Sequence, residues 1–153
     1  MKKINKKVVI GGTFDILHKG HEAFLSRAFG LGEVFIGLTS NEMALRTKKR
    51  QVQDFERRKK ELKRFISKNF KNYYRIGKIE DMFGPTLTEN FDYIIVSPET
   101  NQAAVLINKE RRKINKEPIE IIEIDFILAK DKKPISSTRI FKGEIDRDGN
   151  LIK

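Results

Sequence analysis

The chain has 153 residues, of which 39% are hydrophobic and 35% charged, a composition typical of one globular domain with a heavily charged surface. Its longest apolar runs, such as 93–96, are far shorter than the ~20 residues that cross a bilayer, so we expect no membrane partner. Because the sequence contains no Cys, it excludes a disulfide framework and a thiolate metal site and fits a reducing, cytoplasmic setting.

The formal net charge of +11 favours a phosphate-bearing partner. The charge is concentrated in residues 46–64, where ten basic and three acidic side chains leave a net +7. This segment could be a nucleic-acid surface, a small-anion site or the solvated face of a helix. Single-stranded nucleic acid would call for aromatic stacking platforms among the cations, and only Phe55 and Phe65 lie in or next to the segment. Nucleic acid is therefore the less favoured partner.

Short apolar runs alternate with amphipathic stretches along the chain. The apolar runs predict strands at 7–10, 34–38, 73–79, 93–96 and 119–124. Apolar spacing and capping residues predict helices over 20–29, 54–66 and 100–114, a short helix or loop at 82–90, and a final short helix that opens at 136–138. This alternation predicts a single α/β domain over 1–153, Rossmann-like and doubly wound, with a mainly parallel five-stranded sheet and helices on both faces. From residue 143 onward the chain is turn-rich and polar, and we expect only partial order there.

Residues 11–21, GGTFDILHKGH, follow the first predicted strand and are the most informative stretch. In a doubly wound sheet the carboxyl end of the first strand borders the ligand crevice, and glycines there let a ligand approach the backbone. The helix that begins near Gly20 would direct free N–H groups to the same place, which suits a phosphate. Both histidines of the chain, His18 and His21, fall in this window, so both rings could face one anion.

Two other interpretations of the histidines remain open. A metal site is one, although three or more ligands are expected and the sequence has no third His and no Cys. A buried structural role for His21 is the other, because His21 lies one turn before Phe24 and Leu25. That role would explain one histidine. It would not explain why the Gly-Gly-Thr-Phe-Asp stretch at 11–15 and a second histidine, His18, occur beside it.

The stretch GTFDILHKGH resembles the G-T/S-F-D-x-x-H-x-G-H signature of the nucleotidyltransferase superfamily, which includes cytidylyltransferases and pantetheine-phosphate adenylyltransferases. A second element, ISSTRI at 135–140, resembles the ISSTxxR loop of that superfamily. Three further segments resemble the archaeal type of phosphopantetheine adenylyltransferase, namely 37–40, 96–100 and 142–146. The bacterial branch carries an arginine-rich segment where this chain has SPET at 97–100, so Arg139 and Arg111 become the candidates for meeting the ATP phosphates.

The resemblance implies that the 4′-phosphate of 4′-phosphopantetheine attacks the α-phosphorus of ATP, giving dephospho-CoA and pyrophosphate without a covalent intermediate. The implied partners are ATP, 4′-phosphopantetheine, and dephospho-CoA or CoA, with Mg²⁺ expected on the triphosphate and no metal ligand assigned to the protein. A cytidylyltransferase or an FMN adenylyltransferase on the same scaffold is the alternative. The sequence gives no oligomeric state.

The resemblance also implies roles for individual residues. His21 and His18 would contact the ATP phosphates, and Lys48, or its neighbour Lys49, would bridge the attacking phosphate and the α-phosphate. Asp15 could touch Mg²⁺ or brace the loop. The residues expected to bind nucleotide are Gly12, Thr13, Phe14, Gly20, Ser136, Ser137, Thr138 and Arg139, and those expected to bind the acceptor are Thr13, Lys48, Asp81 and Met82. A plain helix N-cap is the alternative for the residues 136–138.

Overall fold

Five parallel strands form one sheet in the order β3-β2-β1-β4-β5 in the computed structural model, which describes residues 5–152. The strands are β1 (Lys7–Gly12), β2 (Glu33–Thr39), β3 (Tyr74–Ile79), β4 (Tyr93–Val96) and β5 (Glu120–Glu123). The helices are α1 (Lys19–Phe29), α2 (Asn41–Lys48), α3 (Phe55–Asn69), α4 (Asn101–Lys113) and α5 (Ser137–Phe141). The predicted Rossmann-like sheet is thereby confirmed, as are its strands to within one or two residues at each end.

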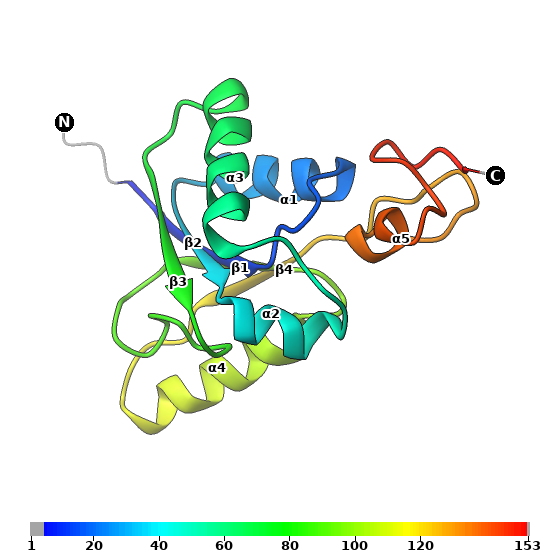
Figure 1. Cartoon of the computed structure of the whole chain (residues 1–153). Helices are drawn as coiled ribbons and strands as arrows, with labels where there is room; N and C mark the ends of the chain where they lie inside the picture. Colours follow the sequence, from blue (N-terminus) through cyan, green and yellow to red (C-terminus); the bar gives the residue numbers. More distant parts are fainter. Residues whose placement is uncertain (1–4, 153) are drawn as a thin grey trace.

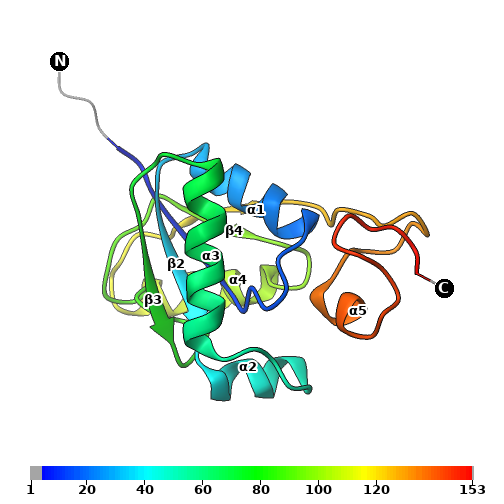
Figure 2. The ribbon, with the colours of Figure 1, turned by 45° about the horizontal axis from the view of Figure 1, so that its top comes forward.

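Helices cover both faces of the sheet, as predicted (Figure 1). Successive side chains of a strand point to opposite faces, so the apolar run of β1 serves two cores. Val8 and Ile10 pack in the core beneath α1 and α3, while Val9 packs in the core beneath α4. Figure 2 shows α1 and α3 together on one side of the strands, with α4 behind them. None of the helices within residues 5–152 is long and apolar enough to cross a membrane.

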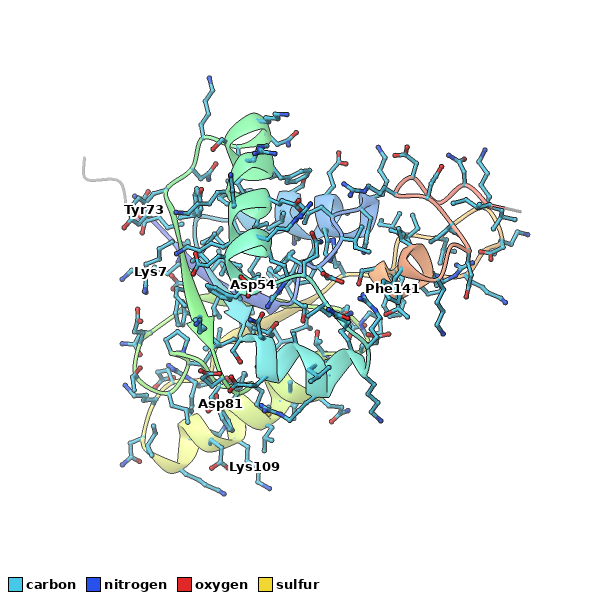
Figure 3. The ribbon with its side chains drawn as sticks, viewed as in Figure 1. Lys7, Asp54, Tyr73, Asp81, Lys109 and Phe141 are labelled. Atoms are coloured by element: carbon cyan, nitrogen blue, oxygen red, sulfur yellow. The ribbon has the colours of Figure 1, made fainter. Side chains whose placement is uncertain are left out.

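Helix α3 is the helix predicted from the basic segment. Asp54 caps it, accepting a hydrogen bond from the Glu56 N–H at 3.0 Å, and Figure 3 shows Asp54 at the foot of the helix. Its predicted apolar stripe is confirmed, because Phe55, Leu62 and Ile66 are all buried. The stripe attaches the helix to β2 and fixes the position of the loop that precedes it.

Helix α2 was not expected from the sequence. Ser40 caps it, accepting a hydrogen bond from the Met43 N–H at 3.1 Å, but Ala44 is its one buried residue. A helix that buries a single small side chain has no apolar stripe, so hydrophobic periodicity does not reveal it.

The C-terminal segment folds around a small apolar cluster of its own beside α5, formed by Ala129, Ile135 and Ile145. Partial order was expected from residue 143, yet Ile145 is fully buried and the Asp146 carboxylate accepts hydrogen bonds from two backbone N–H groups at 2.9 Å. The segment also reaches α1, since the Lys19 N–H donates to the Arg147 carbonyl at 3.1 Å. A turn that is polar in sequence is thus tied to the rest of the chain.

Candidate active site

A cavity of about 390 Å³ lies at the carboxyl ends of β1 and β4. The chain builds outward from β1 to β2 and β3, then returns to place β4 on the other side of β1, so the strand order switches direction between β1 and β4. Ligands of open α/β sheets bind at such a switch point. Residues 11–14, at and just beyond the end of β1, and Ser97 after β4 line the cavity, as this rule predicts.

The two histidines come together at the polar end of the cavity. Their rings stack with centroids 3.8 Å apart and an interplanar angle of 25°. His18 caps α1, and its Nδ1 accepts a hydrogen bond from the Gly20 N–H at 3.0 Å. The Nδ1 atom of His21 is buried and finds no hydrogen-bond partner among the described residues. A buried polar atom without a partner is costly in a finished core and is expected where a ligand completes the site.

Both imidazoles are held in the neutral form. Burial lowers the pKa of His18 to about 4, with the positive charges of Lys48 and Arg147 acting in the same direction. Burial, then His18 and Lys48, lower the pKa of His21 well below its ordinary value. A neutral His18 whose Nδ1 accepts a hydrogen bond carries its proton on Nε2 and can donate it.

Phe14 and two glycines shape the space around the histidines. The Phe14 backbone has a φ of 47°, in the left-handed region, and its buried ring lies 5.1 Å from that of His21. Such strain costs about 1–3 kcal/mol and gathers at functional sites. A Cβ on Gly20 would lie 2.8 Å from the His18 ring, and one on Gly12 would lie 2.8 Å from the Phe14 ring. Both glycines therefore make room for side chains of the site.

The start of α1 offers fewer backbone donors than the sequence suggested. The Lys19 N–H is taken by the Arg147 carbonyl and the Gly20 N–H by His18 Nδ1. An anion at this helix end would therefore depend more on side chains than on the first amides of the helix.

Lys48 lies at the cavity and Lys49 does not. Lys48 ends α2 and lines the cavity, where burial and the charge of Arg50 lower the pKa of its ammonium group, while Glu99 and Asp15 act in the opposite direction. Lys49 is exposed and caps the helix with a φ of 56°. Of the two lysines left open by the sequence, the structure places Lys48 in the candidate site.

Asp15 braces the loop, which is one of its two predicted roles. Its carboxylate is 2% exposed, and both oxygens are engaged. Oδ2 accepts a hydrogen bond from Arg50 Nη1 at 2.7 Å, and Oδ1 accepts one from the Gln53 N–H at 2.9 Å. These contacts leave Asp15 poorly suited to bind Mg²⁺.

Arg50 joins this loop to α5 and was not singled out from the sequence. Its guanidinium donates to Ser137 Oγ at 3.1 Å and to Thr138 Oγ1 at 3.2 Å, and it lies 4.7 Å from the centre of the Phe141 ring. Because Ser137 Oγ accepts from Arg50, its own hydroxyl hydrogen remains available to a ligand. Ser136 caps α5 by accepting from the Arg139 N–H at 3.2 Å, which is the alternative role that the sequence left open. Ser136 and Ser137 line the cavity, whereas Thr138, which was also expected to bind nucleotide, does not.

The structure does not bring Arg139 or Arg111 to the cavity. The guanidinium of Arg139 pairs with Asp131 and with Glu144, the latter at 2.9 Å. Arg111 is buried on α4 and donates to the carbonyl of Thr86 at 2.6 Å. The two arginines stabilise the C-terminal segment and the loop before β4, so other cations must face an anion in the cavity.

The other half of the cavity is apolar. Met82 lines it as predicted. Its neighbour Asp81 is exposed and does not line the cavity; its Oδ1 accepts hydrogen bonds from the N–H groups of Phe83 and Gly84 at 2.9 and 3.2 Å. Further apolar walls come from β3, α4 and the segment after β5, among them Ile79, Ala103, Ala104, Ile107, Ile124, Phe126 and Ile127. The cavity thus combines a cationic, hydroxyl-bearing end with a long apolar end.

Arg58 is the buried residue that organises the polar end. It is fully buried on α3, and its guanidinium donates to the carbonyls of Gln53 at 2.7 Å and Thr13 at 3.0 Å, and to Asn41 Oδ1 at 3.1 Å. A longer contact of 3.4 Å reaches Thr39 Oγ1, which donates to Thr13 Oγ1 at 3.0 Å. Thr13 Oγ1 is therefore an acceptor inside the protein, and its hydrogen can be donated into the cavity.

The sequence contained a signal for Arg58. It lies three residues after Phe55 and four before Leu62, which places it on the buried stripe of α3. Of the possibilities open for the basic segment, the solvated face of a helix does not apply to Arg58, which is fully buried.

Arg58→Lys should destabilise the protein by about 1–3 kcal/mol, because a single ammonium cannot satisfy carbonyls in both the loop after β1 and the loop before α3. The activity of the folded fraction should also fall, since Thr13 loses its support. Arg57→Lys is the matched control: Arg57 is exposed, pairs with Glu61 at 3.4 Å, and should change stability by less than ~0.5 kcal/mol. Urea denaturation of both variants measures this, and equal stabilities would contradict the role given to Arg58.

His18→Gln should flatten the dependence of stability on pH. Between pH 6.5 and about 4 the unfolded chain binds a proton at residue 18 that the folded chain does not, so the wild-type free energy of unfolding should fall as pH falls through this window. One such proton corresponds to ~1.4 kcal/mol per pH unit. Urea denaturation at several pH values should show a shallower slope in the variant, and identical slopes would rule out a neutral, buried His18.

Comparison with known proteins agrees with this geometry. The cytidylyltransferase-like family profile matches residues 9–143. The chain is 46% identical over 150 residues to the phosphopantetheine adenylyltransferase of Methanosarcina acetivorans, and the alignment covers 95% of each protein. It is 43% identical over 156 residues to the phosphopantetheine adenylyltransferase of Pyrococcus furiosus, and that alignment covers 100% of this chain and 98% of the other. A solved structure of a protein of unknown function from Archaeoglobus fulgidus superposes with a TM-score of 0.73 at 37% identity, covering 79% of this chain and 99% of that one. The chain belongs to the phosphopantetheine adenylyltransferase family, within the cytidylyltransferase-like nucleotidyltransferases.

Proposed function

We propose that this protein transfers the adenylyl group of ATP to 4′-phosphopantetheine, giving dephospho-CoA and pyrophosphate in the synthesis of coenzyme A. The observation that carries the proposal is the cavity at the switch point, with stacked neutral histidines and Lys48 at one end and apolar walls at the other. Its volume of about 390 Å³ falls in the range of small-molecule sites.

In this reaction a phosphate oxygen of 4′-phosphopantetheine forms a bond to the α-phosphorus of ATP. The bond from that phosphorus to the oxygen bridging to the β-phosphate breaks, and the electron pair leaves with pyrophosphate. Such a displacement needs alignment of the two phosphates and stabilisation of the charge on the equatorial oxygens. No covalent bond to the protein forms.

The polar end of the cavity supplies suitable donors. Lys48 would lie between the attacking phosphate and the α-phosphate, and Thr13 would donate its hydroxyl hydrogen to the attacking phosphate. The neutral imidazoles would donate N–H groups to the α-phosphate, and a bound polyanion would raise their pKa values and favour the charged form as the transition state develops. Ser137 would donate its hydroxyl hydrogen to the remaining phosphates.

The apolar end suits the acceptor. A pantetheine arm is long, thin and largely uncharged, so it gains from apolar walls such as Met82, Ile107 and Ile127. Its terminal phosphate would then reach the end of β1.

Mg²⁺ belongs to this proposal as part of the ATP substrate. Within residues 5–152, no three His, Cys, Asp or Glu side chains are grouped so that they could hold a metal ion, and both oxygens of Asp15 are engaged. The cation would therefore enter on the triphosphate. A cytoplasmic location, where ATP is available, is also part of the proposal.

Purified protein should release pyrophosphate from ATP when 4′-phosphopantetheine is added. CTP should not replace ATP, and glycerol 3-phosphate and FMN should not replace 4′-phosphopantetheine. Coupled pyrophosphate detection, with dephospho-CoA identified by mass spectrometry, measures the reaction. His21→Ala provides the control against a contaminating enzyme: it should lose turnover and retain most of its ATP affinity, because the contact strengthens mainly in the transition state. No turnover with 4′-phosphopantetheine would overturn the proposal.

Lys48→Ala should lower kcat by ~10²–10³-fold, as expected when one preorganised cation is removed from a transition state. Lys49→Ala should stay within about twofold of wild type, because its exposed side chain lies outside the cavity. Steady-state kinetics of the two variants measures this. Because both variants lose one positive charge, a difference in kcat between them reports the position of the lysine and not the change in net charge. Equal losses in both variants would contradict the placement of Lys48.

A further inference from the structure

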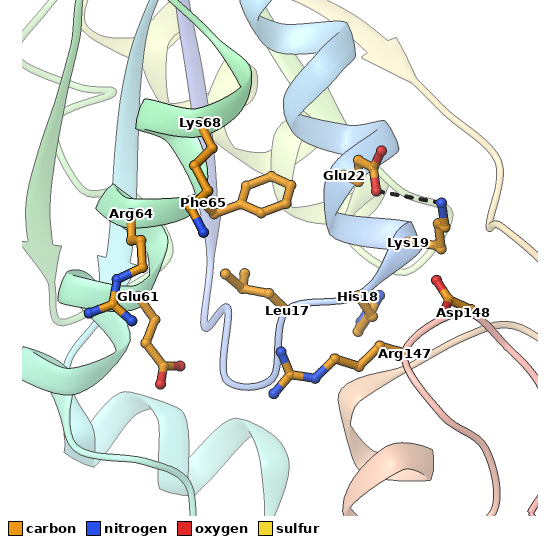
Figure 4. Close-up of a pocket in the computed structure, with 10 residues that line it drawn as sticks. All are labelled: Leu17, His18, Lys19, Glu22, Glu61, Arg64, Phe65, Lys68, Arg147 and Asp148. Carbon is orange, nitrogen blue, oxygen red and sulfur yellow. Dashed lines mark ion pairs between the residues drawn. The ribbon is translucent and has the colours of Figure 1, made fainter.

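A second cavity of about 390 Å³ shares His18 with the candidate active site (Figure 4). It lies where the start of α1, the middle of α3 and the C-terminal turn meet. Ten residues line it: Leu17, His18, Lys19, Glu22, Glu61, Arg64, Phe65, Lys68, Arg147 and Asp148. The family resemblance assigned no role to any of these except His18.

The charges around this cavity favour an anion. Four cations and three carboxylates line it, but two of the carboxylates have partners: Glu22 lies 3.9 Å from Lys19, and Glu61 lies 3.4 Å from Arg57 outside the cavity. Within residues 5–152, Arg64, Lys68 and Arg147 have no ion-pair partner. Against these three cations only Asp148 remains, so the unpaired charge at the cavity is positive.

The chain holds these cations around a common space. Figure 4 shows Arg147 extending from the C-terminal turn past His18 and Leu17 toward Arg64 and Glu61 on α3. The turn that carries Arg147 is fixed by the Asp146 carboxylate and by the hydrogen bond from Lys19. Leu17 and Phe65 supply a partly buried apolar floor, which strengthens the attraction of the cations for an anion.

We propose that this second cavity receives the pyrophosphate that leaves the candidate active site past His18. The inference rests on the proposed function. A small, multiply charged polyphosphate matches three cations that converge from two elements, and His18 connects the cavity with the site where pyrophosphate forms. Arg64, Lys68 and Arg147 are exposed to solvent, so their attraction is screened and binding stays weak enough for a product to depart.

The test measures pyrophosphate binding to the whole protein by isothermal titration calorimetry, without acceptor. Arg64→Ala and Arg147→Ala should each weaken binding by about tenfold, and lower salt should strengthen wild-type binding. Lys63→Ala is the matched control, because Lys63 is an exposed cation on the same helix that does not line the cavity, and its binding should equal that of wild type. Wild-type affinity in both arginine variants would overturn the proposal, as would an equal loss in the control.

Steady-state kinetics then distinguish a cavity that binds the pyrophosphate product from one that binds the β- and γ-phosphates of ATP. The inhibition constant for pyrophosphate should rise in Arg64→Ala and Arg147→Ala while the KM for ATP is unchanged. If both constants rose equally, the cavity would bind the β- and γ-phosphates of ATP, and the proposal that it receives pyrophosphate would be overturned. Because calorimetry requires no turnover, failure of the proposed function in the wild-type assay would be seen separately.

Discussion

The polar end of the active-site cavity depends on one buried positive charge. Arg58 lies where the ends of β1 and β2 meet the loop before α3, and its hydrogen-bond partners at this point are neutral oxygens. Removing a guanidinium from water is costly unless its donors are satisfied. The surrounding chain must therefore keep the backbone carbonyls of Thr13 and Gln53 and the side-chain oxygen of Asn41 directed at one point. That requirement positions Thr13, and Thr13 begins the loop that leads to His18 and into α1, which carries His21.

A second arginine extends this arrangement to α5. Arg50 links the loop after β1 to the hydroxyls of Ser137 and Thr138, so segments far apart in sequence meet at one guanidinium. The ten cations of residues 46–64 thus differ in what they do. Lys48 faces the active-site cavity, Arg50 and Arg58 organise its walls, and Arg64 faces the second cavity. Other cations of the segment, such as Lys60 and Lys63, are exposed on α3.

The sheet could be read from the sequence because its strands are apolar runs and its longer helices carry apolar stripes. Helix α2 could not, since it buries one alanine and depends on a cap. The histidines were singled out because they lie in a glycine-rich stretch after the first strand, and Lys48 because of the family resemblance; the structure brings all three to one cavity. Arg139 was misplaced because its partners, Asp131 and Glu144, become neighbours only when the C-terminal segment folds. Single-sequence patterns do not contain such contacts.

The hydrogen bonds made by the first amides of α1 affect how this site can bind phosphates. Two of them are used within the protein, by His18 and by the Arg147 carbonyl, so phosphate recognition passes largely to side chains. Backbone dipoles keep the same strength at every pH, whereas imidazole groups titrate. Phosphate affinity at such a site should therefore respond to its surroundings: acidification toward pH 4, where His18 gains its charge, should strengthen it, and added salt should weaken it. A helix end that left its amides open would have responded much less to pH.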